Sequence, residues 1–183
     1  MPISLSMLRG INLGAHKKVP MPALKALYES LNFKNVSTYI QSGNVVFEHD
    51  DDLGNLADKL AQSIATHFGF EVPVVIRTLA EMQAVRKENP FLKEANIEAA
   101  HLHVTFLAEI PEQTLLDKIQ TFSAMPDEFR IVGKTIYLHC PNGYGRTKLT
   151  NNFFEQKLKL TATTRNWKTV NELTNMMEAA SKL

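Results

Sequence analysis

Two groups of residues in this sequence combine glycine, arginine and small polar side chains, a combination suited to binding an anion. Glycine lets backbone N–H groups approach a ligand closely, and the planar guanidinium of arginine holds phosphate or carboxylate through paired hydrogen bonds. Both groups lie in basic stretches, with five basic residues against one acidic residue in 9–34 and six against one in 143–168. The candidate ligand-binding residues are Arg9, Asn12, Ser42 and Asn44 in the first group and Arg146, Thr147, Lys148, Arg165, Asn166 and Trp167 in the second.

Turns and helix caps explain many of the same residues, so both interpretations stay open. Gly143 and Gly145 fit a turn, after which Thr147 or Asn152 would cap a helix. Residues 42–44 fit the turn of a β-hairpin. The glycine loop lacks the spacing of a phosphate-binding Walker motif.

Arg146 and Arg165 carry the anion hypothesis in the second group. We expect both side chains to be exposed, so that alanine at both positions leaves the fold intact. Trp167 either stacks on the ring of a ligand or anchors the last helix to its sheet.

Three histidines form a further cluster with possible metal chemistry. His101 and His103 alternate with apolar residues, so we expect them on one face of a strand, next to Tyr137 and His139 of the neighbouring strand. Three imidazoles fit the ligand set of zinc or copper. Because no carboxylate and no usual zinc spacing supports this site, we predict solvated or sheet-packing histidines, no metal and no cofactor.

Motifs of known catalytic sites are missing from the sequence. It contains no Gly-x-Ser-x-Gly, Cys-x-x-Cys or His-Glu-x-x-His pattern. The single cysteine, Cys140, is expected in the core. Whether the protein is an enzyme therefore stays open.

Composition defines the broad class of protein. The chain has 183 residues, 44% hydrophobic residues and a net charge of +1, which is typical of a globular protein and argues against disorder or a nucleic-acid coat. No apolar run is long enough to span a membrane, and the N-terminus does not resemble a secretory signal. One cysteine cannot form an internal disulfide, so we expect a cytoplasmic protein. The C-terminal Ser181-Lys182-Leu183 matches a peroxisomal address but also fits the end of a helix.

Hydrophobic periodicity predicts the same order of elements twice. Strands are expected at 3–8, 36–40, 45–47 and 72–77, with helices from Pro22 to Leu31, from the acidic run 50–52 to Gly69, and over 79–88. Strands follow at 101–107, 128–132, 135–139 and 162–165, with helices over 112–122, through 149–158 and over 167–180. Each half reads β-α-β-β-α-β with one additional helix. We therefore predict an α+β fold of two tandem ferredoxin-like units, 1–90 and 91–183, related by internal duplication.

In a unit of this topology, the loop after the first strand and the following hairpin lie at the same end of the sheet. The loop at 143–148 and the junction at 164–167 likewise share one end of the second sheet. Topology thus gathers each group of candidate binding residues into a cluster.

Two long motifs stand out at residues 8–14 (LRGINLG) and 36–47 (VSTYIQSGNVVF), followed by shorter ones at 19–21, 145–149 and 163–170. On these motifs the sequence resembles a bacterial family named domain of unknown function 1697. The family usually has serine where Thr147 stands, which retains the hydroxyl group. The resemblance implies an α/β fold of two related halves and brings no activity, ligand or catalytic residue.

From these observations we predict a protein that binds a phosphorylated or carboxylated small molecule at its basic loops, with a regulatory role. The alternative is an enzyme of phosphoryl or acyl transfer that uses the same loops. A third alternative is an RNA-binding module, although Phe47 and Tyr137 alone would make poor stacking platforms. We expect no membrane partner, and the oligomeric state is left open.

Overall fold

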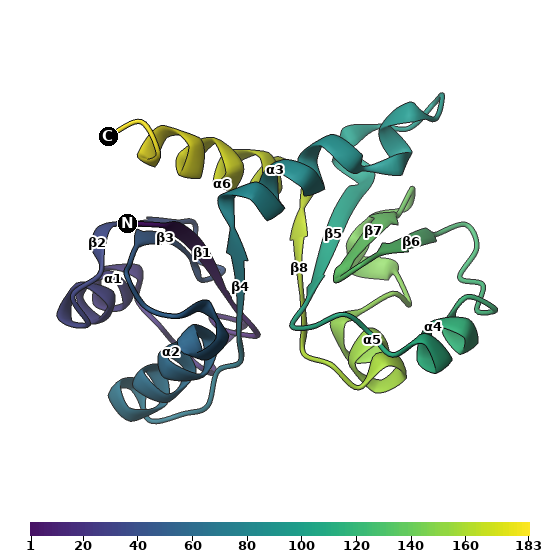
Figure 1. Cartoon of the computed structure of the whole chain (residues 1–183). Coiled ribbons are helices and arrows are strands. Elements are labelled where there is room, and N and C mark those ends of the chain that lie inside the picture. The colour runs from purple at the N-terminus through teal and green to yellow at the C-terminus, as the bar shows by residue number, and fades with distance from the viewer. The chain divides into compact units, whose positions relative to one another are not determined.

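The computed structural model describes all 183 residues and contains two four-stranded antiparallel sheets. The sheets have the equivalent strand orders β2-β3-β1-β4 and β6-β7-β5-β8, the order of a ferredoxin-like unit. The predicted α+β fold of two tandem ferredoxin-like units, each with an additional helix, is therefore confirmed (Figure 1). No helix combines the length and the hydrophobicity needed to cross a membrane.

The elements follow the predicted order in both halves. The first half contains β1 (Ile3–Leu8), α1 (Met21–Ser30), β2 (Lys34–Tyr39), β3 (Asn44–Glu48), α2 (Leu53–Phe68), β4 (Val74–Thr78) and α3 (Leu79–Glu88). The second half contains β5 (Leu102–Leu107), α4 (Gln113–Ile119), β6 (Glu128–Val132), β7 (Thr135–His139), α5 (Asn151–Leu158), β8 (Ala162–Asn166) and α6 (Trp167–Ala180). Three short 3₁₀ helices, η1 (Pro90–Lys93), η2 (Ala99–His101) and η3 (Tyr144–Arg146), lie in the connections.

Each sheet buries one face against two helices. In the first, α1 and α2 cover the face that carries Val45 and Phe47, and Leu24 and Leu60 of these helices are fully buried in the same cluster (Figure 1). In the second, residues of α4 and α5 pack on a face that includes Cys140, which confirms the predicted core position of the cysteine.

Packing divides the chain into two compact units that differ from its two sequence halves. One unit comprises Met1–Gln83 with Glu172–Leu183, and the other comprises Ala84–Asn171. Within the first, the side chain of Gln83 donates a 3.0 Å hydrogen bond to Glu178 of α6. Within the second, the hydroxyl of Tyr137 donates to the Val85 carbonyl oxygen. Each compact unit thus contains part of the additional helix from the other half. The predicted division at residue 90 rests on the order of elements in the sequence alone.

Candidate functional site

The two units share one plan but differ in two loops. The loop between β1 and α1 spans residues 9–20, whereas its counterpart between β5 and α4 spans only 108–112. Conversely, the loop between β7 and α5 spans 140–150, whereas its counterpart between β3 and α2 spans only 49–52. Because a scaffold is stabilised by its helices and strands, long ordered loops that only one copy carries are the natural places for a specific function.

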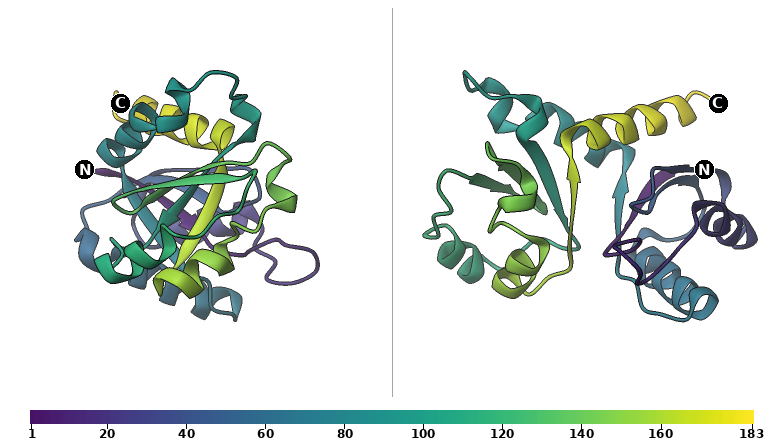
Figure 2. Two further views of the ribbon diagram at one scale, coloured as in Figure 1. Left: turned by 90° about the vertical axis from the view of Figure 1, so that its right-hand side faces the viewer. Right: turned by 180° about the vertical axis from the view of Figure 1, so that it is seen from behind.

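The β1–α1 loop (residues 9–20) is held at its base by Asn12. The side-chain amide of Asn12 donates to the carbonyl oxygens of Val19 and Gln41 at 2.9 and 2.8 Å, and its oxygen accepts from the Val19 N–H at 2.8 Å. Asn12 adopts a left-handed conformation with φ of 54°, which asparagine tolerates well. The loop extends beyond the end of its sheet (Figure 2, left, purple), with His16, Lys17 and Lys18 exposed.

The hairpin at residues 40–43 brings the rest of the first group against this loop. Asn44 is fully buried, and its amide donates to the Tyr39 carbonyl oxygen and to the Ser42 hydroxyl. The half-buried Arg9 donates its backbone N–H to the Pro73 carbonyl oxygen. The structure thus brings the four predicted residues to one end of the sheet, where Asn12, Ser42 and Asn44 hold the loop and the hairpin together.

The β7–α5 loop (residues 140–150) is anchored through stacked rings. The ring of Tyr144 lies on that of His103, with centroids 4.8 Å apart and an angle of 22° between planes. Burial lowers the pKa of His103, so the imidazole beneath the tyrosine is neutral at neutral pH. Backbone hydrogen bonds from Gly143 to Cys140 and from Thr147 to Tyr144 fix the turn. These contacts give the loop a defined conformation.

Arg146 and Lys148 project from this loop on either side of the buried Thr147. The hydroxyl of Thr147 accepts from the Leu149 N–H at 3.1 Å and also bonds the Cys140 thiol, so its side chain points inward. Both cationic side chains are exposed, and neither forms a salt bridge or a hydrogen bond.

The structure corrects the helix caps predicted for this region. The cap of α5 is Thr150, whose hydroxyl accepts from the Phe153 N–H, and is neither Thr147 nor Asn152. Asn166 accepts a 2.8 Å hydrogen bond from the Thr169 N–H at the first turn of α6. Its position is thus that of a helix cap, at the end of the sheet from which the β7–α5 loop begins.

The expectation that Arg165 is exposed is wrong, because its side chain is only 7% exposed. Its guanidinium donates to the Thr163 hydroxyl at 2.8 Å and to the Thr164 carbonyl oxygen at 3.0 Å. Burial lowers the pKa of Arg165 to about 10. Trp167 is also 7% exposed and begins α6, which fits an anchor for the helix.

The expectation that the three histidines meet on one face is also wrong. His103 pairs with Leu138, so it lies on the face covered by α4 and α5, whereas His139 pairs with Leu102 and lies on the opposite face. His101 precedes β5 and lies 6.4 Å from His139 between ring centroids. No group of three His, Cys, Asp or Glu side chains in the structure could hold a metal ion.

The chemistry of Cys140 argues against a thiol nucleophile in this loop. The side chain is fully buried, and burial raises the pKa of the thiol to about 11. At neutral pH the sulfur therefore stays protonated, whereas a nucleophilic cysteine needs its thiolate.

Comparison with known proteins gives a family and a structural relative. The family described as "Protein of unknown function (DUF1697)" matches residues 1–137. The chain belongs to this family. Its fold is similar to that of the conserved bacterial protein SP0830 from Streptococcus pneumoniae, with a TM-score of 0.69 and 21% sequence identity over 96% of this chain and 98% of the other. Comparison with curated proteins gives no match.

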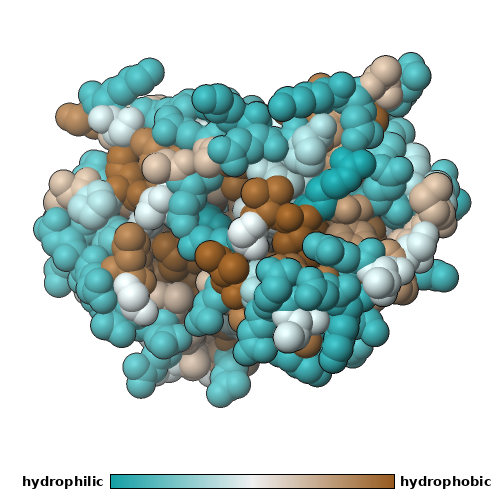
Figure 3. Space-filling view, turned by 45° about the vertical axis from the view of Figure 1, so that its right-hand side comes forward, coloured by the Kyte–Doolittle hydropathy of each residue, from teal (hydrophilic) through white to brown (hydrophobic).

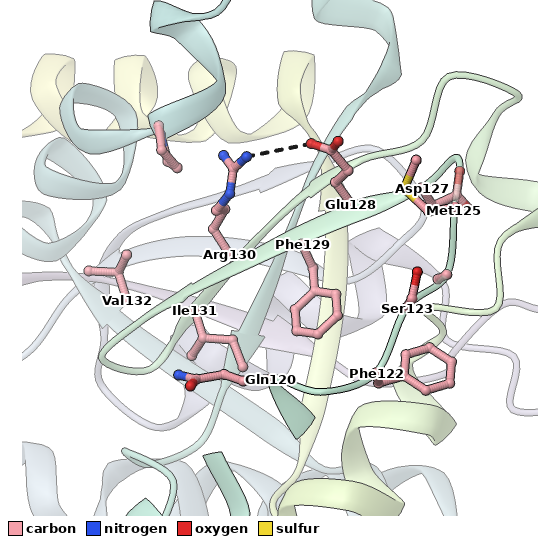
Figure 4. Close-up of a pocket in the computed structure, with 12 residues that line it drawn as sticks. Gln120, Phe122, Ser123, Met125, Asp127, Glu128, Phe129, Arg130, Ile131 and Val132 are labelled. Atoms are coloured by element: carbon pink, nitrogen blue, oxygen red, sulfur yellow. Dashed lines mark ion pairs between the residues drawn. The ribbon is translucent and has the colours of Figure 1, made fainter. Parts of the chain in front are cut away.

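This member of DUF1697 also has a groove that hydrophobic periodicity did not reveal. About 540 Å³ in volume, it runs along β6 beside the segment 120–127 (Figure 4), and Pro90 also lines it. Apart from Pro90, its lining residues come from one continuous segment, 120–132, which runs from the end of α4 through β6. The one sequence signal for it is β6 itself, where charged and apolar residues alternate.

Proposed function

We propose that this chain is a binding protein for a small ligand that carries a phosphate or carboxylate group, and that the β7–α5 loop is its site. The observation that carries the proposal is the pair Arg146 and Lys148, two exposed cations without acidic partners on an ordered loop. A guanidinium and an ammonium group so placed offer several N–H donors to one anion. The loop pays little ordering entropy on binding, because it is already fixed by the Tyr144–His103 stack.

Binding is favoured over catalysis because the loop supplies no activated nucleophile. The Thr147 hydroxyl is engaged by Leu149, and the Cys140 thiol is buried with a raised pKa. RNA binding through the sheets is disfavoured, since Phe47 and Tyr137 are 0% and 1% exposed and neither offers a stacking surface. With its lone cysteine buried, the protein suits a reducing compartment such as the cytoplasm.

Isothermal titration with inorganic pyrophosphate and with citrate at low salt tests the site and separates a phosphate ligand from a carboxylate ligand. We expect saturable binding of one of them, weakened about tenfold or more by R146A/K148A, because charge-assisted hydrogen bonds supply most of the affinity. The control K87A/K118A removes two exposed cations of the same unit outside the loop.

The control decides between a site and a general charge effect. A loss of affinity in K87A/K118A equal to that in R146A/K148A would show that only net charge matters. Absence of saturable binding for both probes would refute the proposal.

A further inference from the structure

The strand β6 forms one edge of its sheet and leaves half of its backbone without a neighbouring strand. It pairs only with β7, in a hairpin closed by the two-residue turn Gly133-Lys134. In such a hairpin the two residues that flank the turn exchange hydrogen bonds with each other. Every second residue pair farther along the two strands does so as well. The N–H and C=O groups of Phe129 and Ile131 therefore point away from β7 and into the groove.

The equivalent edge strand of the first unit is protected, which makes the open edge of β6 notable. β2 has the same place in its sheet, but its register shifts between Lys34 and Ser37, and Asn35 has φ of 48°. Bulges and edge lysines are devices that prevent a sheet from pairing with another chain. β6 pairs in unbroken register and contains neither lysine nor proline.

The side chains of β6 give this edge a charge pattern that complements itself. Glu128 and Arg130 point to one side of the strand, whereas Phe129 and Ile131 point to the other, toward Gln120 (Figure 4). If two copies of β6 pair antiparallel with Phe129 opposite Phe129, Glu128 of each copy lies opposite Arg130 of the other. Centring the pair on Arg130 instead places two guanidinium groups opposite each other, which is destabilising.

Apolar surface beside the strand supports an interface rather than a solvated edge. Met125 in the wall of the groove is 74% exposed, and Val132 at the end of β6 is 49% exposed. On the face of the molecule in Figure 3, apolar residues reach the surface among hydrophilic ones. Arg130 is already held at 2.8 Å from Glu94 and stacked over the ring of Phe91, so it is positioned before a partner arrives.

We propose that β6 pairs with β6 of a second copy of this chain, antiparallel and centred on Phe129, so that two four-stranded sheets become one sheet of eight strands. A five-residue strand with the walls of its groove buries less than the ~1,600 Å² of a standard interface. The dimer is therefore weak and forms as the protein concentration rises.

Charge reversal tests the pairing by sedimentation velocity across about two decades of protein concentration up to ~0.5 mM. Wild type is expected to dimerise. E128R and R130E alone place like charges opposite each other and weaken the dimer about tenfold or more. An equimolar mixture of the two variants restores association, because two arginines then face two glutamates. The control E109R/K87E changes exposed charges outside the groove.

Cysteine cross-linking tests the register. In F129C the two new cysteines lie opposite each other with Cα atoms about 5.5 Å apart, within disulfide range. In I131C, a change of the same kind on the same face, they are displaced by about 14 Å along the strand and cannot join. We expect a covalent dimer from F129C only, since the native Cys140 is fully buried.

Each contrary result overturns the proposal. A monomer at every concentration shows that the edge does not self-associate, and a dimer insensitive to both charge reversals uses another surface. A mixture that fails to restore association, or cross-linking of I131C, excludes the Phe129-centred pair.

Discussion

Arg77 and Arg165 occupy the same position in the two sheets. Arg77 of β4 lies opposite Leu5 of the central strand β1, and Arg165 of β8 lies opposite Val104 of the central strand β5. Both are buried, and burial lowers the pKa of each to about 10. The next residue in each strand caps the following helix: Thr78 bonds reciprocally with Glu81, and Asn166 accepts from Thr169. The duplicated scaffold thus retains a buried arginine before a helix cap, which points to a structural role.

Alanine at Arg165 should destabilise the protein, whereas alanine at Arg146 should not. R165A removes a buried guanidinium and leaves the Thr163 hydroxyl without this donor, so we expect a loss of about 2–4 kcal/mol in the free energy of unfolding. R146A changes an exposed side chain and should stay within about 0.5 kcal/mol of wild type. Urea denaturation monitored by circular dichroism measures both. Equal losses would contradict the structural role of Arg165.

The sequence predicted the elements well because their hydrophobic periods are clear. The strand at 128–132, the strand at 135–139 and the helix at 167–180 have their predicted bounds. The face of each residue was harder to predict, because both faces of the second sheet are buried. Leu102 and Val104 are buried on one face of β5, while Thr105 and Leu107 are buried on the other. Alternation therefore showed a strand but not which side His103 would take.

The candidate site was predictable in its position but not in the exposure of its side chains. Topology correctly placed the β7–α5 loop and the β8–α6 junction at one end of the sheet. Burial of Arg165 follows from what covers its face of the sheet, and a single sequence carries no signal for that. Arg146 and Arg165, alike in sequence context, thus differ in environment.

Gly43 allows the hairpin at residues 40–43 to pack closely against the end of β1 and the β1–α1 loop. A Cβ atom at this position would lie 2.7 Å from Ile11 Cδ1 and 2.8 Å from Leu8 Cβ, and φ is +81°. Because the Leu8 Cβ atom cannot move without the backbone, G43A should cost about 3 kcal/mol or more. Gly14 also has positive φ but open space around it, so G14A should cost only about 1 kcal/mol. Thermal or urea denaturation of both variants checks the difference, and similar costs would disprove a close approach at Gly43.

Burial of His103 beneath Tyr144 makes stability depend on pH below neutrality. Because burial lowers the pKa of His103 in the folded state, the unfolded chain binds a proton first as the pH falls. The free energy of unfolding should therefore decrease as the pH drops below about 6.5, the ordinary histidine value. H103F retains a ring beneath Tyr144 but cannot titrate. Comparing wild type with H103F by urea denaturation at several pH values isolates this contribution from the other histidines, and identical pH profiles would exclude it.

Asn12 should control local opening of the β1–α1 loop. N12D preserves the shape of the side chain and still accepts from the Val19 N–H, but it places a carboxylate oxygen against the carbonyl oxygens of Val19 and Gln41. Two carbonyl oxygens that lose their donor and face a carboxylate should cost about 1 kcal/mol or more together, so the loop should open well before the sheet unfolds. Hydrogen exchange reads this directly: in N12D the Val19 amide should lose protection, while amides of the central strand β1, such as Leu5, keep it. If the Val19 amide stays as protected as in wild type, Asn12 does not hold the loop; if Leu5 loses protection equally, the loop and the sheet open as one unit.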